Sequence, residues 1–394
     1  HTVAMYSNED INSLFRIKAD EAYLIGENQS PLGAYLDIPG IIDLAKRRGV
    51  DAIHPGYGFL SENADFARAC ENSGIKFIGP PSHILAQMGD KLAAKATAIA
   101  CGVPIIPGST EPLKGADEAV EKAVSYGFPI ILKAAAGGGG RGMRRCDSEE
   151  EVRVNFELVK NEARKAFGNE DIFIEKFLVQ PKHIEVQILA DEHGNVMHLG
   201  ERDCSLQRRY QKVVEYAPAW SVPRATIEAL RADAVKIAKY VGYVNAGTVE
   251  FLVDQSTGQH YFIEMNPRIQ VEHTVTEMVT GVDLVRAQVL IAEGHPLSDE
   301  RIGLARQEDL HINGYAIQCR VTTEDPANNF APDTGKITAY RSGGGFGVRL
   351  DGGNAAAGTV ISPYYDSLLV KVTSWDNTFE GACRRAARAV SEEH

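Results

Sequence analysis

The sequence predicts a fold of mixed class, an α/β segment followed by α+β segments, and three patterns along the chain predict it. Residues 1–85 alternate short apolar runs with amphipathic stretches, the rhythm of a domain built on a parallel sheet. Residues 86–295 mix helical patterns with several alternating strands, and residues 310–394 are dominated by short strands before a last helix. The polar stretch 295–310 is typical of a connector.

The first segment begins directly on an apolar run, TVAMYS. Domains built on parallel sheets usually open with a strand, a glycine turn and a helix, so we expect an opening strand and helix to be missing from residues 1–85. We expect the last helix, near residues 379–390, to stop early. The sequence therefore predicts a truncated first domain and a truncated last one.

The composition argues against several classes of function. The chain has 41 Lys and Arg residues against 53 Asp and Glu residues, a net charge of −12 that is unfavourable for a nucleic-acid partner. No apolar run is long enough for a membrane span, and the first residues do not resemble a signal peptide. The six cysteines lie far apart without a C-x-x-C pair, which predicts a reduced, cytoplasmic protein without a zinc site.

A glycine-rich stretch, KAAAGGGGRGM at residues 133–143, is the first candidate for binding. An apolar strand at 129–134 precedes it, a short extended stretch at 143–147 follows it, and a helix is expected only after a capping box at Ser148 and Glu151. A dinucleotide-binding loop needs its helix immediately, so that interpretation is disfavoured. A glycine hairpin that folds over a triphosphate and a merely flexible turn both stay open.

Two lysines favour the triphosphate. Lys133 closes an apolar strand just before the glycines, and Lys91 lies in the helical stretch MGDKLAAK. Each lysine alone is more often a surface residue whose stem covers apolar neighbours. Together with the glycine-rich stretch, they suggest two ammonium groups on one polyphosphate.

Two glutamates lie on the strands of a predicted hairpin, residues 247–268. If the hairpin is symmetric about Thr257, Glu250 faces Glu264 and both share one face of the sheet. Carboxylates placed directly opposite one another repel by roughly 0.2–1 kcal/mol. A divalent cation would reverse that sign, and Mg²⁺ accepts one or two carboxylates plus phosphate oxygens, so the pair fits an ATP·Mg site. An exposed hairpin with two solvated glutamates is the alternative.

The hairpin runs into EMNPRIQVEHT, residues 264–274. Asn266 adds an oxygen ligand on the face of the preceding glutamate, and Arg268, Gln270 and Glu272 then alternate along an extended segment before a helix. A guanidinium, an amide and the N–H groups of a helix start form a pocket for a small planar anion. A glutamate inside such a pocket makes chemical sense as a base that deprotonates the anion.

Taken together, these stretches resemble the biotin carboxylase module, an ATP-grasp enzyme, over nearly the whole chain. The resemblance rests on KAAAGGGGRGM, ERDCSLQRRYQKVVE, EMNPRIQVEHTVTE, HPGYGFLSEN, GGGFGVRLD and SPYYDSLLVKV. It implies a truncated Rossmann-like, pre-ATP-grasp domain at 1–85, an ATP-grasp domain at 86–295 with a lid around 109–178, and a truncated biotin carboxylase C-terminal domain at 310–394. Within the family, QPKHIEVQ, YVNAGTVEFLV, VTTEDP and DTGKITAYRSGGGFGVRLD are most similar to the pyruvate carboxylase branch.

The resemblance also implies the nucleotide site. It assigns ATP phosphates to Lys91 and Lys133 under a lid with Gly139 and Gly140, adenine to Glu175, Lys176 and Leu178, a further nucleotide contact to His183, and Mg²⁺ or Mn²⁺ beside ATP to Glu250, Glu264 and Asn266. The family usually has histidine in Q-R-R-H-Q-K, where this chain has Tyr210. A phenol can donate one hydrogen bond but carries no charge near neutral pH, and Tyr210 stays a nucleotide-site candidate.

The remaining roles that the resemblance implies concern bicarbonate and biotin. It assigns bicarbonate to Lys212, Arg268, Gln270 and Val271, the base to Glu272, the stabilisation of a biotin enolate to Arg349, and the biotin pocket to Tyr57 together with that arginine. Lys212, Arg268, Glu272 and Arg349 are thus the expected catalytic residues.

The expected activity is ATP-dependent carboxylation of biotin by bicarbonate through carboxyphosphate. The resemblance implies that biotin arrives on a carrier domain, that a carboxyltransferase domain uses the product, and that the module commonly forms a homodimer. Three alternatives stay open: the biotin carboxylase of an acyl-CoA carboxylase, another ATP-grasp ligase of the carbamoyl-phosphate synthetase or D-alanine ligase type, and an inactive, truncated ATP-binding module.

Overall fold

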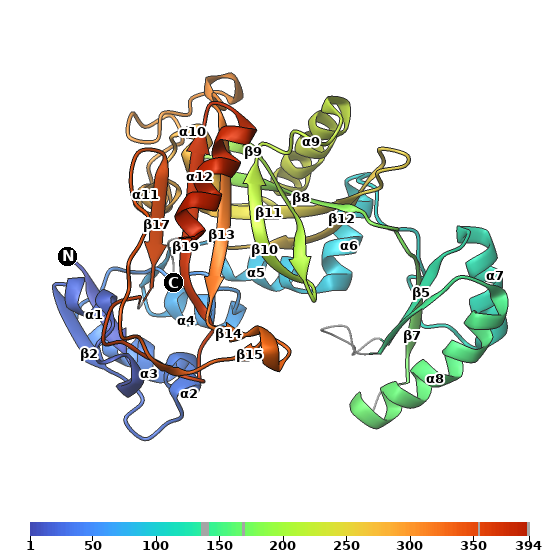
Figure 1. The fold of residues 1–394 in the computed structure, drawn as a ribbon, viewed down its shortest axis with the longest axis horizontal. Coiled ribbons are helices and arrows are strands. Elements are labelled where there is room, and N and C mark those ends of the chain that lie inside the picture. The colour runs from blue at the N-terminus through green and yellow to red at the C-terminus, as the bar shows by residue number, and fades with distance from the viewer. Residues whose placement is uncertain (135–141, 168–169, 354, 392–394) are drawn as a thin grey trace. The chain divides into compact units, whose positions relative to one another are not determined.

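The chain folds into two compact units, and the computed structural model describes residues 1–134, 142–167, 170–353 and 355–391 (Figure 1). The first unit combines His1–Thr97, His183–Glu250 and Glu264–His394, and the second combines Ala98–Lys182 with Phe251–Ile263. Each unit is described by itself below. Among the described residues, no helix is both long and apolar enough to span a membrane.

The N-terminal part of the first unit alternates short strands with helices, as the sequence predicts. Its elements are β1 (Val3–Tyr6), α1 (Leu14–Lys18), β2 (Glu21–Leu24), α2 (Pro31–Leu36), α3 (Ile38–Arg47), β3 (Ala52–Ile53), α4 (Ala64–Asn72), β4 (Lys76–Phe77), α5 (Ser82–Gly89) and α6 (Lys91–Ala100). The strand pairs β1–β2 and β3–β4 are both parallel. Side-chain caps set the helix starts: Ser30, Asp37 and Asn63 each accept a backbone N–H three residues on.

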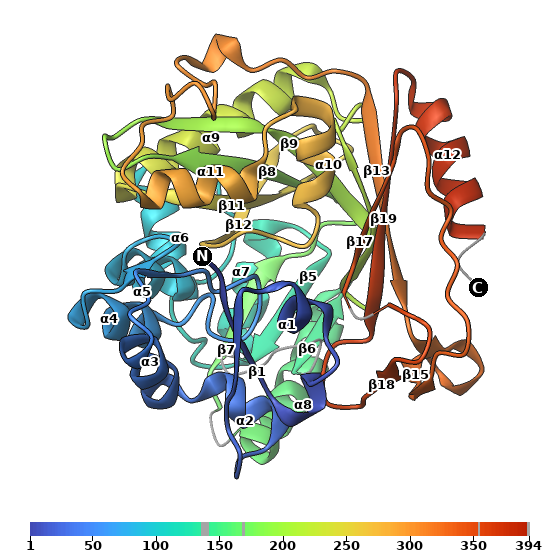
Figure 2. The same cartoon turned by 90° about the vertical axis from the view of Figure 1, so that its left-hand side faces the viewer.

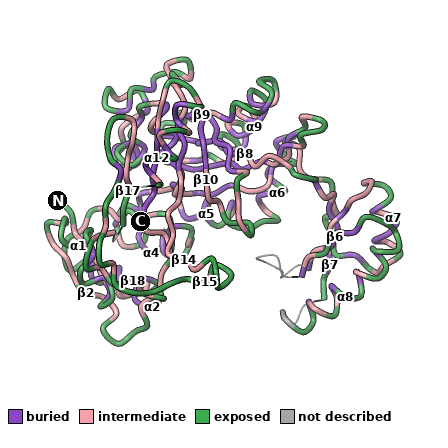
Figure 3. Tube along the Cα trace, viewed as in Figure 1, coloured by how far each residue is buried: buried purple, intermediate pink, exposed green. Residues whose placement is uncertain are grey.

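An eight-stranded sheet, in the order β12-β11-β8-β9-β10-β13-β19-β17, carries the predicted site. Its strands are β8 (Lys182–Ala190), β9 (Val196–Arg208), β10 (Gln211–Ala217), β11 (Asn245–Val253), β12 (His260–Asn266), β13 (Tyr315–Thr322), β17 (Val348–Gly352) and β19 (Leu368–Asp376). Figure 3 shows that most residues of β8 and β9 are buried. Polar side chains on these strands are therefore held in an enclosed environment.

Helices cover the sheet on both faces. They are α9 (Arg224–Val241), α10 (His273–Thr280), α11 (Leu284–Ala292) and α12 (Phe379–Ser391). Neighbouring residues of β10 point to opposite sides: Ala217 packs under α10, whereas Tyr216 packs under α12. The two helices accordingly lie on opposite sides of β13 and β19 (Figure 2). Short elements complete this unit: η1 (Asn8–Asp10), η2 (Gln307–Asp309), η3 (Pro326–Asn328), β14 (Glu324–Asp325), β15 (Ala331–Pro332), β16 (Gly335–Lys336) and β18 (Val360–Ile361).

The second unit is a small antiparallel sheet packed against helices. Its order is β6-β5-β7, and its elements are α7 (Ala116–Tyr126), β5 (Ile130–Ala134), β6 (Met143–Cys146), α8 (Glu149–Phe167) and β7 (Ile172–Lys176). Ile130, Leu132 and Ile174 are fully buried in its core. The glycine-rich stretch joins β5 to its antiparallel neighbour β6, so the predicted strand-to-strand connection is confirmed. Its residues 135–141 lie outside those described.

Strands β11 and β12 are neighbours in the sheet, as the hairpin prediction requires. The turn differs from the predicted symmetry about Thr257, which would place Asp254 opposite His260. Instead the Asp254 N–H donates to the Gln259 carbonyl at 2.9 Å, and its carbonyl accepts from the Gly258 N–H at 2.8 Å. These backbone hydrogen bonds pair Asp254 with Gln259 instead of His260, so the predicted turn was wrong by one residue.

Candidate active site

A cavity of about 330 Å³ lies in the first unit and gathers most of the residues predicted to carry the chemistry. Strands β8 to β13 form its floor, and the extended segment before α10 forms one wall. It is lined by Tyr57, His183, Gln207, Tyr210, Lys212, Glu250, Glu264, Asn266, Arg268, Gln270, Val271, Glu272 and Arg320. The alternation predicted for residues 264–272 thus places its polar side chains on one cavity.

Lys212, on β10, joins three carboxylates at the centre of this cavity. Its Nζ donates to Glu185 Oε2 at 2.5 Å, to Glu272 Oε1 at 2.7 Å and to Glu250 Oε1 at 2.9 Å. Burial alone would lower the pKa of Lys212, but the surrounding carboxylates raise it well above its ordinary value. The ammonium group is therefore a permanent positive charge between acids that come from three different parts of the chain.

Beneath Lys212, Arg202 on β9 is completely buried and uses its whole guanidinium group. It donates to Glu185 Oε1 at 2.5 Å and also to oxygens of Gln187, Thr248, Gln270 and Thr276. Burial raises the pKa of Glu185, but the charges of Arg202 and Lys212 outweigh it and lower that pKa to about 2. An ionised carboxylate and two cations thus form a charged floor beneath the cavity, whose lining includes Lys212 but neither Glu185 nor Arg202.

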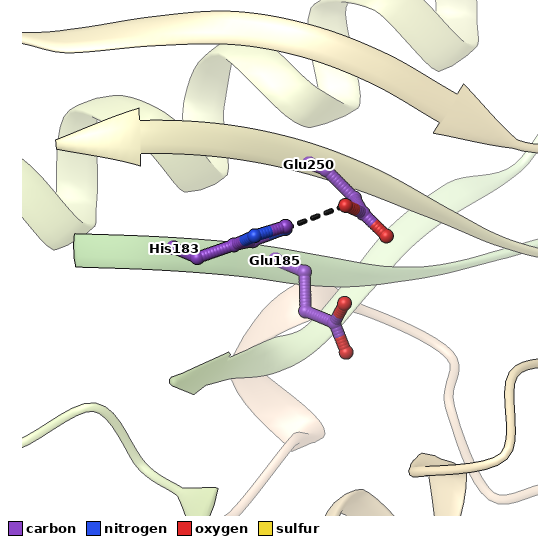
Figure 4. Close-up of side chains that lie close together, drawn as sticks. All are labelled: His183, Glu185 and Glu250. Carbon is purple, nitrogen blue, oxygen red and sulfur yellow. Dashed lines mark hydrogen bonds and ion pairs between the residues drawn. The ribbon is translucent and has the colours of Figure 1, made fainter. Parts of the chain in front are cut away.

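Glu250 lies on β11 and is saturated with donors. Its Oε1 accepts from Asn266 Nδ2 at 2.9 Å and from Gln270 Nε2 at 2.8 Å, besides Lys212. Its Oε2 meets His183 Nε2 at 2.5 Å, the contact drawn in Figure 4. Despite burial, Lys212 and His183 hold the pKa of Glu250 well below its ordinary value, and Glu250 in turn raises the pKa of His183 against the effect of burial.

Among the described residues, three sets of side chains qualify as cation ligands by chemistry, and one of them, Glu185, Cys204 and Glu272, is fully buried. In the described part of the chain, ligand atoms of His183, Glu185 and Glu250 lie within 4.8 Å of one another (Figure 4). Glu185 of that set is already bound by both Arg202 and Lys212, so we assign it to the charge network rather than to a cation. The predicted set keeps Glu264, whose pKa is raised by burial and by the charge of Glu250. A divalent cation would remove both penalties, so Glu250, Glu264 and Asn266 fit Mg²⁺.

The wall before α10 is built from the predicted anion-binding residues. Arg268 pairs with Glu62 at 3.2 Å and donates from Nη2 to Asn266 Oδ1 at 3.1 Å. Gln270 links two networks, because its Oε1 accepts from Arg202 and its Nε2 donates to Glu250. The Val271 carbonyl accepts from the buried Lys371 at 3.0 Å. These contacts fix the direction in which each polar group faces the cavity.

Glu272 is the buried N-cap residue of α10, and each of its carboxylate oxygens is held by a different cation. Oε1 accepts from Lys212 at 2.7 Å, and Oε2 accepts from Arg320 Nη2 at 3.1 Å. The carboxylate of the predicted base therefore has a fixed plane at the cavity wall.

Several predicted residues lie at the cavity margin or away from it. Tyr57 and Tyr210 line the cavity but are 44% and 79% exposed. Arg349, on β17, is absent from the lining and instead binds Glu277 at 2.5 Å and Asp351 at 2.8 Å. Lys91 begins α6, and its charge lowers the pKa of Glu264, opposing the effect of burial.

The remaining predicted nucleotide contacts belong to the second unit. Lys133, the last lysine before the glycines, forms an ion pair with Glu175, one of the residues assigned to adenine. Lys176 donates to the Gly127 and Phe128 carbonyls at 2.8 and 2.9 Å, and Leu178 is buried. Gly139 and Gly140 lie outside the described residues.

Sequence reasoning missed four residues that shape the cavity: Glu185, Arg202, Gln207 and Arg320. Arg320 lies in the otherwise apolar strand GYAIQCRV, the same signal that singled out Lys133, so it could have been found. Arg202 and Glu185 lie on strands that become neighbours only through the β8–β9 pairing, where they stand opposite each other. Their partnership has no counterpart in local sequence spacing.

Comparisons with known proteins agree with this geometry. Residues 1–85 match the biotin carboxylase N-terminal domain, residues 90–300 match the ATP-binding domain of the carbamoyl-phosphate synthase L chain, and residues 318–394 match the biotin carboxylase C-terminal domain. The chain belongs to the biotin carboxylase family. The predicted family and fold class are therefore confirmed, as is the predicted enzyme class, an ATP-dependent ligase that carboxylates biotin. The matched N- and C-terminal domains distinguish it from other ATP-grasp ligases.

Curated relatives and solved structures place it near pyruvate carboxylases. It is 57% identical to the pyruvate carboxylase of Bacillus subtilis (strain 168) and 58% identical to the mitochondrial pyruvate carboxylase of Homo sapiens, each over 99% of this chain. It spans only 34% and 33% of those proteins. The biotin carboxylase domain of a thermophilic 2-oxoglutarate carboxylase bound to bicarbonate is 47% identical, with a TM-score of 0.93 over 100% of this chain and 84% of that one. The biotin carboxylase subunit of a pyruvate carboxylase is 50% identical, with a TM-score of 0.85 over 100% and 85%.

Proposed function

We propose that this biotin carboxylase is the module of a pyruvate carboxylase that transfers a carboxyl group from bicarbonate to biotin at the expense of ATP. The observation that carries the proposal is Glu272, a buried carboxylate held between Lys212 and Arg320 on the wall that also presents Arg268. Cations around the site attract bicarbonate, and the carboxylate among them accepts its proton.

The nucleotide and the metal use the residues assigned above. We assign Lys91 and Lys133 to ATP phosphates, Gly139 and Gly140 to the lid, and Glu175, Lys176 and Leu178 to adenine. His183 and Tyr210 face the nucleotide. Glu250, Glu264 and Asn266 would hold Mg²⁺ or Mn²⁺, which would neutralise charge on the phosphate oxygens.

The first chemical step joins bicarbonate to phosphate. Lys212, Arg268, Gln270 and Val271 hold the anion, and Glu272 takes its proton as a bicarbonate oxygen attacks the γ-phosphorus of ATP. A phosphorus–oxygen bond forms, the bond to the β-phosphate oxygen breaks, and the products are carboxyphosphate and ADP. The buried cations offset the charge that develops on the transferred group.

The second step carboxylates biotin. Carboxyphosphate breaks down to CO₂ and phosphate, the phosphate takes the ureido N1 proton of biotin, and N1 bonds to the carbon of CO₂. Arg349 stabilises the biotin enolate, and Tyr57 borders the biotin pocket. Exclusion of water matters here, because water would hydrolyse carboxyphosphate.

The partner domains are those that the family resemblance implies: a biotin carrier domain that visits this module and a carboxyltransferase domain that uses the product. The names of the relatives favour pyruvate as the final acceptor. An acyl-CoA carboxylase is the alternative acceptor system. The module forms a homodimer, as does the biotin carboxylase domain of the 2-oxoglutarate carboxylase from Hydrogenobacter thermophilus. The six free cysteines favour a reducing compartment, the cytoplasm, although several relatives are mitochondrial.

The test is ADP release from Mg·ATP, measured with and without bicarbonate and free biotin, in the wild type and in Glu272→Gln. We expect turnover to require both additions and to fall by roughly 10²–10⁴-fold in the variant, the usual contribution of a general base. Glu308→Gln, at an exposed position outside the cavity, is the matched control and should keep wild-type turnover. ATP binding without bicarbonate-dependent turnover would instead support an inactive nucleotide-binding module.

A further inference from the structure

Arg320 joins the expected base to a second buried carboxylate. Its Nε donates to Glu215 Oε1 at 2.6 Å, and its Nη2 donates to Glu272 Oε2 at 3.1 Å. Both glutamates are buried, and the arginine itself lines the cavity. One planar guanidinium group therefore spans the distance between a carboxylate on β10 and the carboxylate at the start of α10.

A chain of buried hydrogen bonds holds Glu215, the second carboxylate that Arg320 contacts. Gln318 Nε2 donates to Glu215 Oε2 at 2.9 Å, and Gln318 Oε1 accepts from Thr274 Oγ1 at 2.5 Å. The same hydroxyl lies 2.8 Å from Thr373 Oγ1 on β19. Because Thr274 is only two residues from Glu272, the chain returns to the helix that carries the base. Residues of three strands thus hold the first turn of α10 in place.

The geometry of this bridge depends on an arginine. A guanidinium group presents several N–H donors in a rigid plane and can serve two carboxylates in fixed directions, whereas an ammonium group is a point charge without that plane. A lysine at this position would preserve the positive charge but could not impose the same two directions. The single substitution Arg320→Lys therefore separates the effect of the guanidinium geometry from the effect of the positive charge.

We propose that Arg320, anchored by Glu215, is a positioning residue that orients the Glu272 carboxylate toward bicarbonate. The proposal rests on the proposed function, in which Glu272 is the base. Lys212 holds one oxygen of that carboxylate and Arg320 holds the other, so that loss of Arg320 leaves the group free to rotate about its contact with Lys212.

The kinetic test compares Arg320→Lys with Arg231→Lys. Arg231 is a matched control, since it also donates from Nε to a buried glutamate, Glu201, at 2.6 Å, and has a similarly buried side chain, but lies outside the cavity. We expect Arg320→Lys to lower kcat for bicarbonate-dependent ADP release by roughly 100-fold, the cost of a misplaced group, with the KM for ATP unchanged. Arg231→Lys should leave both constants near wild type.

A second variant tests the anchor. Glu215→Gln keeps an oxygen for Arg320 but removes the charge, and we expect kcat to fall by roughly 10-fold, less than in Arg320→Lys. The double variant should be little worse than Arg320→Lys alone, because both changes disturb one contact. Losses that multiply, or equal losses in the Arg231→Lys control, would overturn the proposal.

Crystal structures of the wild type and of Arg320→Lys provide a readout that does not depend on turnover. We expect the Glu272 carboxylate to move by more than the ~0.5 Å that catalytic geometry tolerates. An unmoved carboxylate that keeps its contact with Lys212 would refute the positioning role even if turnover fell. A wild-type chain without bicarbonate-dependent turnover would instead remove the proposed function, and the two structures would still decide whether Arg320 orients Glu272.

Discussion

Two buried glutamates in the same sheet, Glu185 on β8 and Glu215 on β10, have pKa values that are shifted in opposite directions. Glu185 binds two cations, Arg202 and Lys212, and its pKa is lowered to about 2. Glu215 binds one cation, Arg320, which it shares with Glu272, and burial raises its pKa to about 7. Similar burial therefore accompanies pKa shifts in opposite directions, because the number of cations per carboxylate differs.

The comparison separates two regions of the site by what they can do. Around Glu185 the cations outweigh the cost of burial, so the charges there are fixed over the whole physiological pH range. Around Glu215 one guanidinium group is divided between two acids, and a proton can be held or released near neutral pH. The first region is a rigid floor, and the second responds to pH at the wall where a proton is proposed to be taken from bicarbonate.

The largest expected effect on stability comes from removing Arg202 from the region around Glu185. Arg202→Met removes a fully buried cation together with its five hydrogen bonds and leaves Glu185 with Lys212 alone. We expect the free energy of unfolding to fall by about 3–5 kcal/mol, the cost of stranding a buried charge. Urea denaturation would measure it, with Arg224→Met as control, since that arginine is exposed and should cost less than ~0.5 kcal/mol. A stability equal to wild type would show that Lys212 compensates fully.

A pH dependence should distinguish the second region. The pKa of Glu215 is raised from 4.5 in the unfolded chain to about 7, so the stability that its protonated form contributes is present below pH 4.5 and is lost as the pH rises through 7. Glu215→Gln is neutral at every pH. Relative to wild type, this variant should gain up to roughly 3 kcal/mol of unfolding free energy between pH 4.5 and pH 8. A constant difference across that range would contradict the raised pKa.

Removing Gln318, the second hydrogen-bond partner of Glu215, should lower the free energy of unfolding by a smaller amount. Gln318→Met deletes the donor at 2.9 Å and leaves the carboxylate with Arg320 alone. We expect a loss of about 1–3 kcal/mol, larger at pH 8 than at pH 5 because an ionised acceptor loses more than a protonated one. Gln307→Met, which removes hydrogen bonds to the His198 backbone, is a control whose effect should not depend on the ionisation of a carboxylate. The same loss at both pH values would show that Glu215 does not titrate between them.

The sequence predicted one of these regions better than the other. Arg268, Gln270 and Glu272 could be assigned to one face because they alternate within a single extended segment, and the structure places all three on the cavity. The motif combination also identified the family. Glu185 and Arg202 could not be paired in advance, because they meet only through the antiparallel register of two strands. Periodicity states which face a side chain occupies, not which distant residue shares it.

The misses elsewhere have two different causes. The turn of the β11–β12 hairpin was placed one residue out, because its backbone bonds from Asp254 to Gly258 and Gln259 are not specified by the alternation of its strands. Arg320 was passed over although a cation in an apolar strand had already marked Lys133 as functional. Local patterns predicted the elements and the wall of the cavity, whereas the charge network beneath it arises from tertiary pairing.

The smallest expected effect on stability comes from the same substitution, threonine to valine, made once in the region around Glu185 and once in the region around Glu215. Thr248→Val removes an oxygen that accepts from Arg202 at 3.1 Å, whereas Thr373→Val removes a hydroxyl that meets the Thr274 hydroxyl at 2.8 Å. Both side chains are fully buried, and valine has nearly the same shape as threonine. A hydrogen bond to a charged group contributes about 1.5–3 kcal/mol and a neutral one about 0.5–1.5 kcal/mol. Denaturation should therefore show the larger loss of unfolding free energy for Thr248→Val. Equal losses would mean that the four other acceptors of Arg202 satisfy its charge. The charged floor would then tolerate the loss of any single hydrogen bond.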